Sequence, residues 1–405
     1  MKILQINPVT GRYSTGRSTT ELNQFFRQMG HTSYVAAAFP MEKDEYKIGC
    51  AFDRKIHSLL ARLSGLEACF SSIPTLGLIR YIKRLRPDVV KIGVIHSNYV
   101  NYYMLLCYLS KREIPVVLVL NDCWHYTGKC VHYTRNQCMK WKTGCGDCPH
   151  LENGIPTWFF DRTELLLKKK KDSLRKLPKL AVVGVSQWIT DEASQSILKD
   201  ADIVQRIYNW VDFKKFYPRG TAELVQKLGI AHQRVVLGVA SSWSEGKGLD
   251  DFVRLAGMLG DGYAIVLVGR IADGSIVGGN IFCVGEVHDT NVLAQYYSLA
   301  DIFVTLSREE SFGKVSAEAL ACGTPVVCFD STASPELVGD GCGYVAKNDD
   351  LKDICAGIKD LCSKPKFYYA EACVRYAKEN FSFEENAGQY LDLFHKLIEI
   401  GENCE

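Results

Sequence analysis

A strand, a loop, a helix and a second strand follow one another closely in the last third of this chain, and this succession constrains its fold most. Residues 300–306 are apolar and rich in β-branched and aromatic side chains, which predicts a buried parallel strand. Residues 316–321 are helix formers that end at Cys322 and Gly323, a C-cap signal, and residues 326–329 predict the next strand. Such a succession predicts a parallel α/β sheet.

The loop between the first strand and the helix has the features of a ligand site. Gly313 has no Cβ that would keep a ligand from the backbone. The unpaired N–H groups and positive dipole end of a helix N-terminus suit a phosphate. Glu310 precedes this helix and Glu318 follows eight residues later, so both carboxylates could accept hydrogen bonds from sugar and ribose hydroxyls. On spacing alone, a solvated Glu310 and an ordinary surface Glu318 stay open as the plainer interpretation.

The sequence of residues 310–327, Glu-Ser-Phe-Gly-x-Val-x-x-Glu-Ala-Leu-Ala-Cys-Gly-Thr-Pro-Val-Val, resembles the signature of the retaining nucleotide-sugar glycosyltransferases of family 4. The resemblance extends over essentially the whole chain and is to the bacterial polysaccharide or colanic-acid type. It implies the GT-B architecture, an α/β fold of two Rossmann-like domains that face a cleft, with a C-terminal helix crossing back to the first domain. We expect an acceptor-side domain at 1–211 plus 381–405, with a Cys-rich insertion at 123–150, and a nucleotide-sugar-binding domain at 212–380.

The resemblance also implies roles for single residues. Glu310 would bind the donor sugar, Glu318 the ribose, and Lys247, within Glu-Gly-Lys-Gly after the predicted strand 234–240, the diphosphate. Relatives commonly have an arginine where Ser242 stands here. Fewer positive charges would therefore neutralise the departing diphosphate, unless Arg270 or Arg17 contributes. The expected donor-binding residues are Gly16, Ser241, Ser242, Lys247, Gly269, Val287, Phe312, Gly313, Lys314, Val315 and Glu318.

The first strand of the chain, at residues 2–6, leads into a turn rich in small residues that ends at Gly16. Gly16 permits close approach of a phosphate, and Ser14 and Thr15 add donors. The segment is similar to the N-terminal loop of family 4, which faces the donor phosphates. An ordinary surface loop before a helix at 21–29 remains the alternative.

Polar residues follow the apolar run 114–120, at the carboxyl end of a predicted central strand, where open α/β sheets bind ligands. Relatives usually have histidine where this chain has Asn121, and also where it has Lys91 and Gly93. Asparagine can donate and accept hydrogen bonds but cannot titrate. The residues we expect to be catalytic are Glu310, Lys247, Asn121, Asp122 and His125, with His96 as a further candidate.

Five cysteines lie between residues 123 and 148, and the last two form a Cys-x-x-Cys knuckle. Such a knuckle places two thiolates on one side of a soft cation, and two further cysteines complete a tetrahedron. Cys130, Cys138, Cys145 and Cys148 are the four expected ligands of a structural zinc ion. Free buried thiols and redox pairing stay open. We expect no catalytic metal, because catalytic zinc usually has histidine or carboxylate ligands and an open position.

The bulk properties exclude several classes of protein. The 405 residues carry a net charge of only +2, so nothing indicates a nucleic-acid partner. The short apolar start fits no signal peptide, and no apolar run is long enough to span a bilayer. With 16 cysteines and no export signal, we expect a cytoplasmic protein with thiols that are not a disulfide framework. Basic residues at 54–86 and 168–171 could lie on anionic lipid at the inner face of the cell membrane, or be solvated.

The resemblance to family 4 implies a hexosyl-type glycosyltransferase. It would move a sugar from a UDP- or GDP-sugar to a glycan acceptor, expected to be lipid-linked, in cell-surface polysaccharide biosynthesis, including capsule and lipopolysaccharide. A non-catalytic nucleotide-sugar or glycan-binding protein on the same scaffold is one alternative. A sugar-nucleotide epimerase or phosphorylase is the other.

Overall fold

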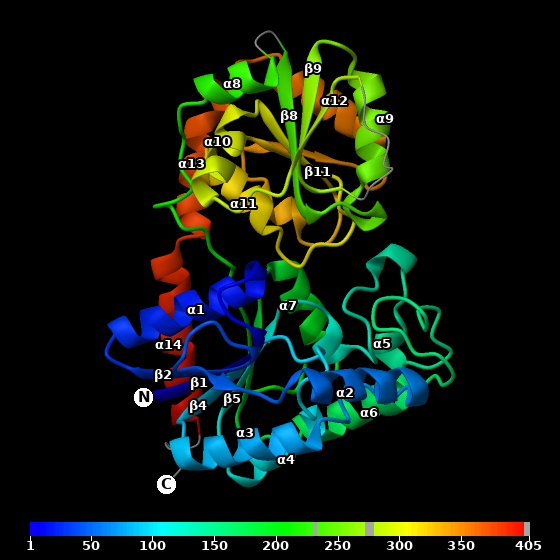
Figure 1. Cartoon of the computed structure of the whole chain (residues 1–405), viewed down its shortest axis with the longest axis vertical. Coiled ribbons are helices and arrows are strands. Elements are labelled where there is room, and N and C mark those ends of the chain that lie inside the picture. The colour runs from blue at the N-terminus through cyan, green and yellow to red at the C-terminus, as the bar shows by residue number, and fades with distance from the viewer. Residues whose placement is uncertain (231–232, 272–278, 401–405) are drawn as a thin grey trace. The chain divides into compact units, whose positions relative to one another are not determined.

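The computed structural model describes residues 1–230, 233–271 and 279–400, and the chain divides into two compact units (Figure 1). The first unit comprises Met1–Ile207 and the segment from Ala387 onward, and the second comprises Tyr208–Asn386. These limits lie a few residues from the expected boundaries at 211 and 381. Among the helices of the described ranges, none combines the length and apolar character that crossing a bilayer requires.

The first unit contains a seven-stranded sheet in which all neighbouring strands are parallel. The strand order is β3-β2-β1-β4-β5-β6-β7, which is a Rossmann order with an extra edge strand. Its central strands are buried on both faces, as the uninterrupted apolar run of β5 predicts. The strands are β1 (Lys2–Val9), β2 (Thr32–Phe39), β3 (Tyr46–Lys47), β4 (Val89–Ile92), β5 (Val116–Leu120), β6 (Leu180–Gly184) and β7 (Ile203–Arg206).

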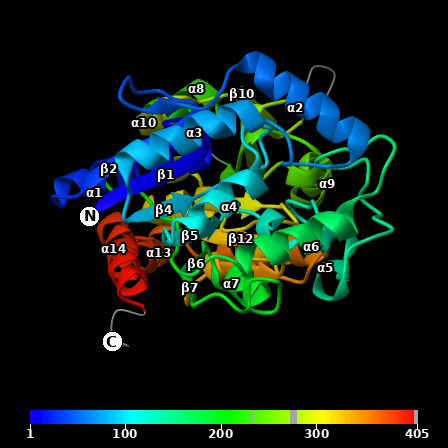
Figure 2. The same ribbon diagram turned by 90° about the horizontal axis from the view of Figure 1, so that it is seen from below.

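Helices cover this sheet, and α3, α4 and α6 lie in a row across the unit (Figure 2). The helices are α1 (Tyr13–Gln28), α2 (Ala51–Ser64), α3 (Ser72–Leu85), α4 (Tyr102–Lys111), α5 (Lys140–Thr143), α6 (Thr163–Leu174) and α7 (Gln187–Ser194), with short 3₁₀ turns η1 (Trp124–Tyr126) and η2 (Thr134–Asn136).

The last helix, α14 (Phe383–Glu399), joins the first unit from Ala387 onward, as the GT-B architecture predicts. Its Phe394 ring packs 5.5 Å from that of Phe26 on α1, and the ammonium of Lys91 lies 5.7 Å from the centre of the Tyr390 ring. Burial lowers the pKa of Lys91 to about 8.

The second unit repeats the Rossmann order in a six-stranded parallel sheet, β10-β9-β8-β11-β12-β13. Its strands are β8 (Arg234–Ser242), β9 (Tyr263–Arg270), β10 (Ile281–Gly285), β11 (Ile302–Thr305), β12 (Val326–Phe329) and β13 (Gly343–Ala346). Its helices are α8 (Ala222–Leu228), α9 (Leu249–Leu259), α10 (Thr290–Leu299), α11 (Lys314–Ala321), α12 (Leu351–Leu361) and α13 (Phe367–Asn380), with 3₁₀ turns η3 (Glu245–Lys247) and η4 (Ser334–Leu337).

Helix α1 begins earlier than the sequence predicts. The expected turn ending at Gly16 is mostly helix, because α1 starts at Tyr13 and not near residue 21. The amide of Gly11 donates to the carbonyl of Gly16 and to the hydroxyl of Thr20, so hydrogen bonds to the preceding loop fix this first turn. Tertiary contacts thus override the weak helix propensity of the serines and threonines.

Gly269, at the end of β9, is required by the close approach of two strands. Its φ is +129°, and an added Cβ would lie 1.7 Å from the carbonyl oxygen of Ala240 on β8. No L side chain fits this position without moving the backbone.

We therefore expect Gly269→Ala to lower the free energy of unfolding by about 2 kcal/mol or more, because it adds both a clash and backbone strain. Gly257→Ala is the matched control, since Gly257 lies within α9 and an added Cβ there meets nothing within 4 Å. That change should raise the free energy of unfolding by about 0.5–1 kcal/mol. Urea unfolding of both variants measures the two effects. Equal free energies of unfolding in the two variants would contradict the packing requirement at Gly269.

Candidate active site

Two of the expected donor-site residues, Lys247 and Glu310, lie at one edge of the sheet of the second unit. Strand order runs outward from β8 to β9 and β10 on one side and from β11 to β12 and β13 on the other. The carboxyl ends of β8 and β11 therefore mark the point at which the order reverses, where open α/β sheets bind ligands. Lys247 follows β8, and Glu310 follows β11.

These two residues form an ion pair. The Lys247 ammonium lies 2.5 Å from Glu310 Oε1 and 3.4 Å from the hydroxyl of Ser307. The Lys247 side chain is 42% exposed and that of Glu310 is 18% exposed, so both reach the surface of the unit. A cation and a carboxylate in contact at a sheet edge can bind an anion and a hydroxyl side by side.

The loop that carries Glu310 is held from two sides. The backbone amide of Glu310 donates a hydrogen bond of 2.9 Å to the hydroxyl of Thr332, and the backbone carbonyl of Glu310 accepts one from the amide of Ala333. Two residues earlier, the guanidinium of Arg308 pairs with Asp251 at 2.9 Å and with Asp349. Thr332 and Arg308 were not among the expected site residues. The sequence could have indicated Thr332, because it follows β12, the strand beside β11, and the carboxyl ends of adjacent parallel strands lie at the same edge of a sheet.

The helix after this loop begins as predicted. Gly313 is the N-cap of α11 with φ of +87°, a left-handed conformation that favours glycine. The amides of Gly313, Lys314 and Val315 lie in the first turn, which an α-helix leaves without intrahelical acceptors. The ring of Phe312 is buried against Phe381 at 5.3 Å and Tyr208 at 6.0 Å, so this residue can offer a ligand only its backbone.

Glu318 lies inside the unit. It is 2% exposed, and its carboxylate accepts a hydrogen bond of 3.0 Å from the hydroxyl of Tyr297 on α10. The expectation that its carboxylate contacts ribose therefore stays a prediction, and the contact that the structure contains is structural, joining α10 to α11.

The other expected donor residues differ in exposure. Ser241 and Ser242 are exposed at the end of β8, and Val287 is half-buried after β10. Gly269 has the packing role described above, and Arg270 beside it is exposed.

In the first unit, the expected residues lie after β4 and β5. Asp122 Oδ2 is 2.8 Å from His96 Nε2, and both side chains remain partly exposed. Burial disfavours the imidazolium, but the charge and hydrogen bond of Asp122 outweigh it and raise the pKa of His96. Burial opposes ionisation of Asp122 as well, yet His96 and the amide of Trp124 lower its pKa to about 2. These contacts join His96 to the ionised carboxylate of Asp122 and favour the protonated form of His96. The carboxamide of Asn121, by contrast, donates a long hydrogen bond of 3.4 Å to the carbonyl of Val119.

The catalytic role expected for His125 stays a prediction, and the contacts that the structure contains are structural. His125 is buried, with Nε2 3.1 Å from the carbonyl oxygen of Gly93 and Nδ1 3.1 Å from the Tyr102 hydroxyl. Burial lowers its pKa to about 4, so it is neutral near pH 7. Its two ring nitrogens are both occupied, and it acts as an internal brace between β4 and α4.

At two of the positions where relatives have histidine, Gly93 and Lys91, the residues of this chain take part in internal packing. A Cβ at Gly93 would lie 2.6 Å from Asn7 Oδ1, which accepts a hydrogen bond from the amide of Val94. Lys91 contacts α14, as described above. Gly16 likewise packs inward, because an added Cβ would lie 3.0 Å from Val9 Cγ2 and 3.2 Å from its carbonyl oxygen.

The second basic run is not a continuous surface feature. Lys170 is fully buried, and its ammonium donates to the carbonyls of Trp124, Thr127 and Gly128 while lying 3.4 Å from the centre of the Trp124 ring. Burial lowers its pKa to about 8.

The four expected zinc ligands line one small pocket, described further below. Within the described ranges, no group of three or more His, Cys, Asp or Glu side chains is already spaced to hold a metal ion.

The effect of Asp122 on the pKa of His96 can be tested by titration. We expect the pKa of His96 to lie above its ordinary value of about 6.5 and to fall below it in Asp122→Asn, because burial remains when the carboxylate is removed. The pair should stabilise the fold between about pH 4 and 6.5 and lose this contribution as pH rises through the folded pKa of His96. NMR titration of the imidazole measures the shift, and an unchanged pKa in the variant would refute it.

Three comparisons place these features among known proteins. Residues 221–380 match the family described as "Glycosyl transferases group 1". A protein of Escherichia coli (strain K12) named for colanic acid biosynthesis as a glycosyl transferase, WcaC, is 24% identical over 277 residues, 65% of either chain. The chain spans less than two thirds of the length of the first curated relatives that it matches.

Solved structures share the whole fold. Sucrose-phosphate synthase from Thermosynechococcus elongatus superposes with a TM-score of 0.71 at 14% identity, covering 99% of this chain and 100% of that one. Anabaena Alr3699/HepE in complex with UDP-glucose gives 0.66 at 16% identity, covering 98% and 100%. Residues 221–380 thus match the group 1 glycosyl transferases, and the chain as a whole shares the two-domain Rossmann-like fold of these glycosyltransferase structures.

Proposed function

We propose that the chain is a retaining glycosyltransferase that moves a sugar from a nucleoside diphosphate sugar to a lipid-linked glycan acceptor in cell-surface polysaccharide biosynthesis. The single observation that carries the proposal is the contact between Lys247 and Glu310 at the point where the strand order of the second sheet reverses. It supplies a cation for a diphosphate and a carboxylate for sugar hydroxyls at one place.

In the proposed reaction, the chain stabilises the departing diphosphate and orients the sugar. The Lys247 ammonium neutralises phosphate charge, and the amides at the start of α11 donate hydrogen bonds to phosphate oxygens. Glu310 accepts hydrogen bonds from the sugar, and its position is fixed by Thr332 and Ala333. Catalysis would come mainly from positioning and charge stabilisation.

UDP-sugars are the donors that we propose first, ahead of GDP-sugars. The support is that HepE, which shares the fold over nearly its whole length, is titled as a complex with UDP and with UDP-glucose. The identity of the sugar is left to the donor panel described below.

For the first unit, we propose that Asp122 and His96 contribute to binding the sugar or the acceptor. Their side chains reach the surface as an ion pair at the ends of neighbouring strands. Because Gly93 and Asn121 stand where relatives have histidine, this pair offers the titratable imidazole at that sheet edge.

We further propose that the first unit docks on anionic lipid through the α2 surface, which we define as the exposed apolar face of α2 together with Trp158, Phe159 and Phe160. These three aromatic side chains are 51%, 66% and 50% exposed. On α2 only His57 and Ala61 are buried. The exposed apolar residues of the helix are Phe52, Ile56, Leu59, Leu60 and Leu63.

The α2 surface is one continuous feature with cations along it. The amide of Trp158 donates to the carbonyl of Arg62, and the Arg62 guanidinium lies 5.9 Å from the Trp158 ring centre. Arg162 lies 5.4 Å from the Phe160 ring centre, and Lys55 on α2 is exposed. Exposed aromatic rings beside arginine and lysine fit the interface of an anionic bilayer.

Donor use is tested with a panel of UDP- and GDP-sugars, scored both by protection against thermal unfolding and by release of nucleoside diphosphate in the presence of glycan acceptors. We expect Lys247→Ala to reduce turnover by about 10²-fold, because it removes charge stabilisation from the leaving group. Glu310→Ala should lose turnover too, and Glu310→Gln should lose less because its amide oxygen still accepts hydrogen bonds.

Lys227→Ala is the matched control, since Lys227 is an exposed lysine on α8 of the same unit. Equal turnover in the Lys247 and Lys227 variants would remove the proposed role. Protection by a nucleotide sugar without release of nucleoside diphosphate would favour the non-catalytic alternative.

Membrane docking is tested by co-sedimentation with phosphatidylcholine vesicles that contain phosphatidylglycerol. Replacing Phe159 and Phe160 by Ser should weaken binding by about a hundredfold, since each of the two buried rings contributes roughly 1.5 kcal/mol or more. The control replaces Phe367 and Tyr368 by Ser, two exposed aromatic residues on α13. Binding that ignores phosphatidylglycerol, or that falls equally in both double variants, would argue against the α2 surface.

A further inference from the structure

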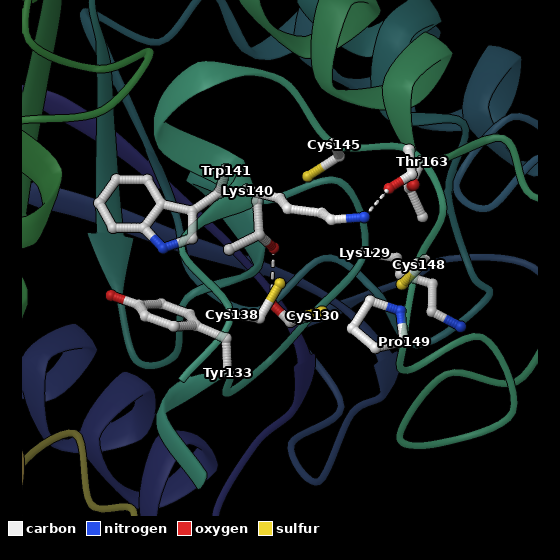
Figure 3. Close-up of a pocket in the computed structure, with 12 residues that line it drawn as sticks. Lys129, Cys130, Tyr133, Cys138, Lys140, Trp141, Cys145, Cys148, Pro149 and Thr163 are labelled. Atoms are coloured by element: carbon white, nitrogen blue, oxygen red, sulfur yellow. Dashed lines mark hydrogen bonds between the residues drawn. The ribbon is translucent and has the colours of Figure 1, made fainter. Parts of the chain in front are cut away.

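The Cys-rich segment forms a pocket of about 20 Å³, close to the size of one water molecule, whose lining includes four thiols (Figure 3). Cys130, Cys138, Cys145 and Cys148 reach it from three separate turns of the chain. Seven, six and two residues separate them in sequence. The pocket is too small for a sugar, but it is of the right order for a single ion.

The thiols lie close to one another. The thiol of Cys130 donates a hydrogen bond to the sulfur of Cys148, and both interact electrostatically with Cys145. Cys145 in turn interacts with Cys138. Each of the four is therefore linked to at least one of the others.

Two backbone amides and one cation lie beside the sulfurs of the pocket. The amide of Gly128 donates a hydrogen bond to the sulfur of Cys145. The amide of His150 donates one to the sulfur of Cys148, which lies two residues before it in the chain. The ammonium of Lys129, whose side chain also lines the pocket, adds positive charge. Amide donors and a nearby cation offset the charge that builds up when several thiolates share one ion.

We propose that this pocket is a structural zinc site in which Cys130, Cys138, Cys145 and Cys148 bind one Zn²⁺. The Cys-x-x-Cys knuckle, two further cysteines on the same pocket and a closed position match the donor set of structural zinc. Among the described residues, no three of these sulfurs already lie at the spacing of metal ligands, so the inference rests on where the backbone places the four cysteines. A change of one cysteine χ1 rotamer moves its sulfur by a few ångströms while the backbone stays in place.

The ion would stiffen the segment that follows β5. Gly128, whose amide bonds to Cys145, also offers its carbonyl to the buried ammonium of Lys170, which holds Trp124 and Thr127 as well. The site would thus fix one end of the turn that begins at Asp122. Metal binding would contribute directly to the stability of this segment.

The test begins with the unaltered full chain, purified under reducing conditions and dialysed against metal-free buffer. Elemental analysis by inductively coupled plasma mass spectrometry should find about one zinc ion per chain. Iodoacetamide labelling followed by peptide mapping should find the four pocket cysteines protected and the exposed Cys50 and Cys107 modified, with the protection lost after chelation. Zinc well below one per chain, or pocket thiols that label as fast as Cys107, would overturn the proposal.

Variants then locate the ion without depending on one substitution. Cys138→Ser should lower zinc content severalfold, Cys138→His should restore much of it because imidazole is a zinc ligand, and Cys107→Ser should leave it unchanged. Replacing the metal by Co²⁺ should give the absorption of a tetrahedral thiolate complex. A disulfide between Cys130 and Cys148 in the purified chain, or zinc that persists unchanged in Cys138→Ser, would refute the site.

Discussion

The contact between Lys247 and Glu310 depends on the order of strands in the second sheet. The two residues are 63 positions apart in the chain and meet only because β11 lies directly beside β8. The surrounding contacts serve this meeting point: Arg308 ties the loop after β11 to Asp251 on α9, and Thr332 holds the backbone of Glu310. A charged pair that remains partly exposed, with its loop held by hydrogen bonds and ion pairs, suits a site where one partner must exchange its contact for a ligand.

The first unit separates its polar groups into two kinds. His125 and Lys170 are buried and fully occupied, and burial keeps His125 neutral near pH 7. His96 and Asp122, which follow β4 and β5, stay partly exposed and contact each other at 2.8 Å. The buried groups thus hold the turn after β5 in place, and the exposed pair is available for binding. This division explains how two histidines close together can have opposite pKa shifts.

Much of the second unit could be predicted from its sequence. The βαβ succession around Gly313, the helix end at Gly323 and the strand at 326–329 all form as expected, because local propensity and packing agree there. Strand β2 was not predicted. Thr32, Tyr34, Val35 and Phe39 favour a strand, but the three consecutive alanines at 36–38 weaken the signal, and pairing with β1 fixes the conformation.

Site residues were harder to predict than the sheet, because a sequence does not say which way a side chain faces. His125 follows a central strand, as a catalytic residue would, yet it faces inward. Glu318 is in the expected helix but is buried against Tyr297. Asn7 was passed over, although its carboxamide occupies the space beside Gly93.

The path of α14 has a practical consequence for anyone who dissects this molecule. The first unit is not contiguous, since its surface around Phe26 and Lys91 is covered by residues at the far end of the chain. A fragment that stops at residue 207 would leave that apolar surface bare, so the first unit should be produced with the segment from Ala387 onward joined to it by a short linker.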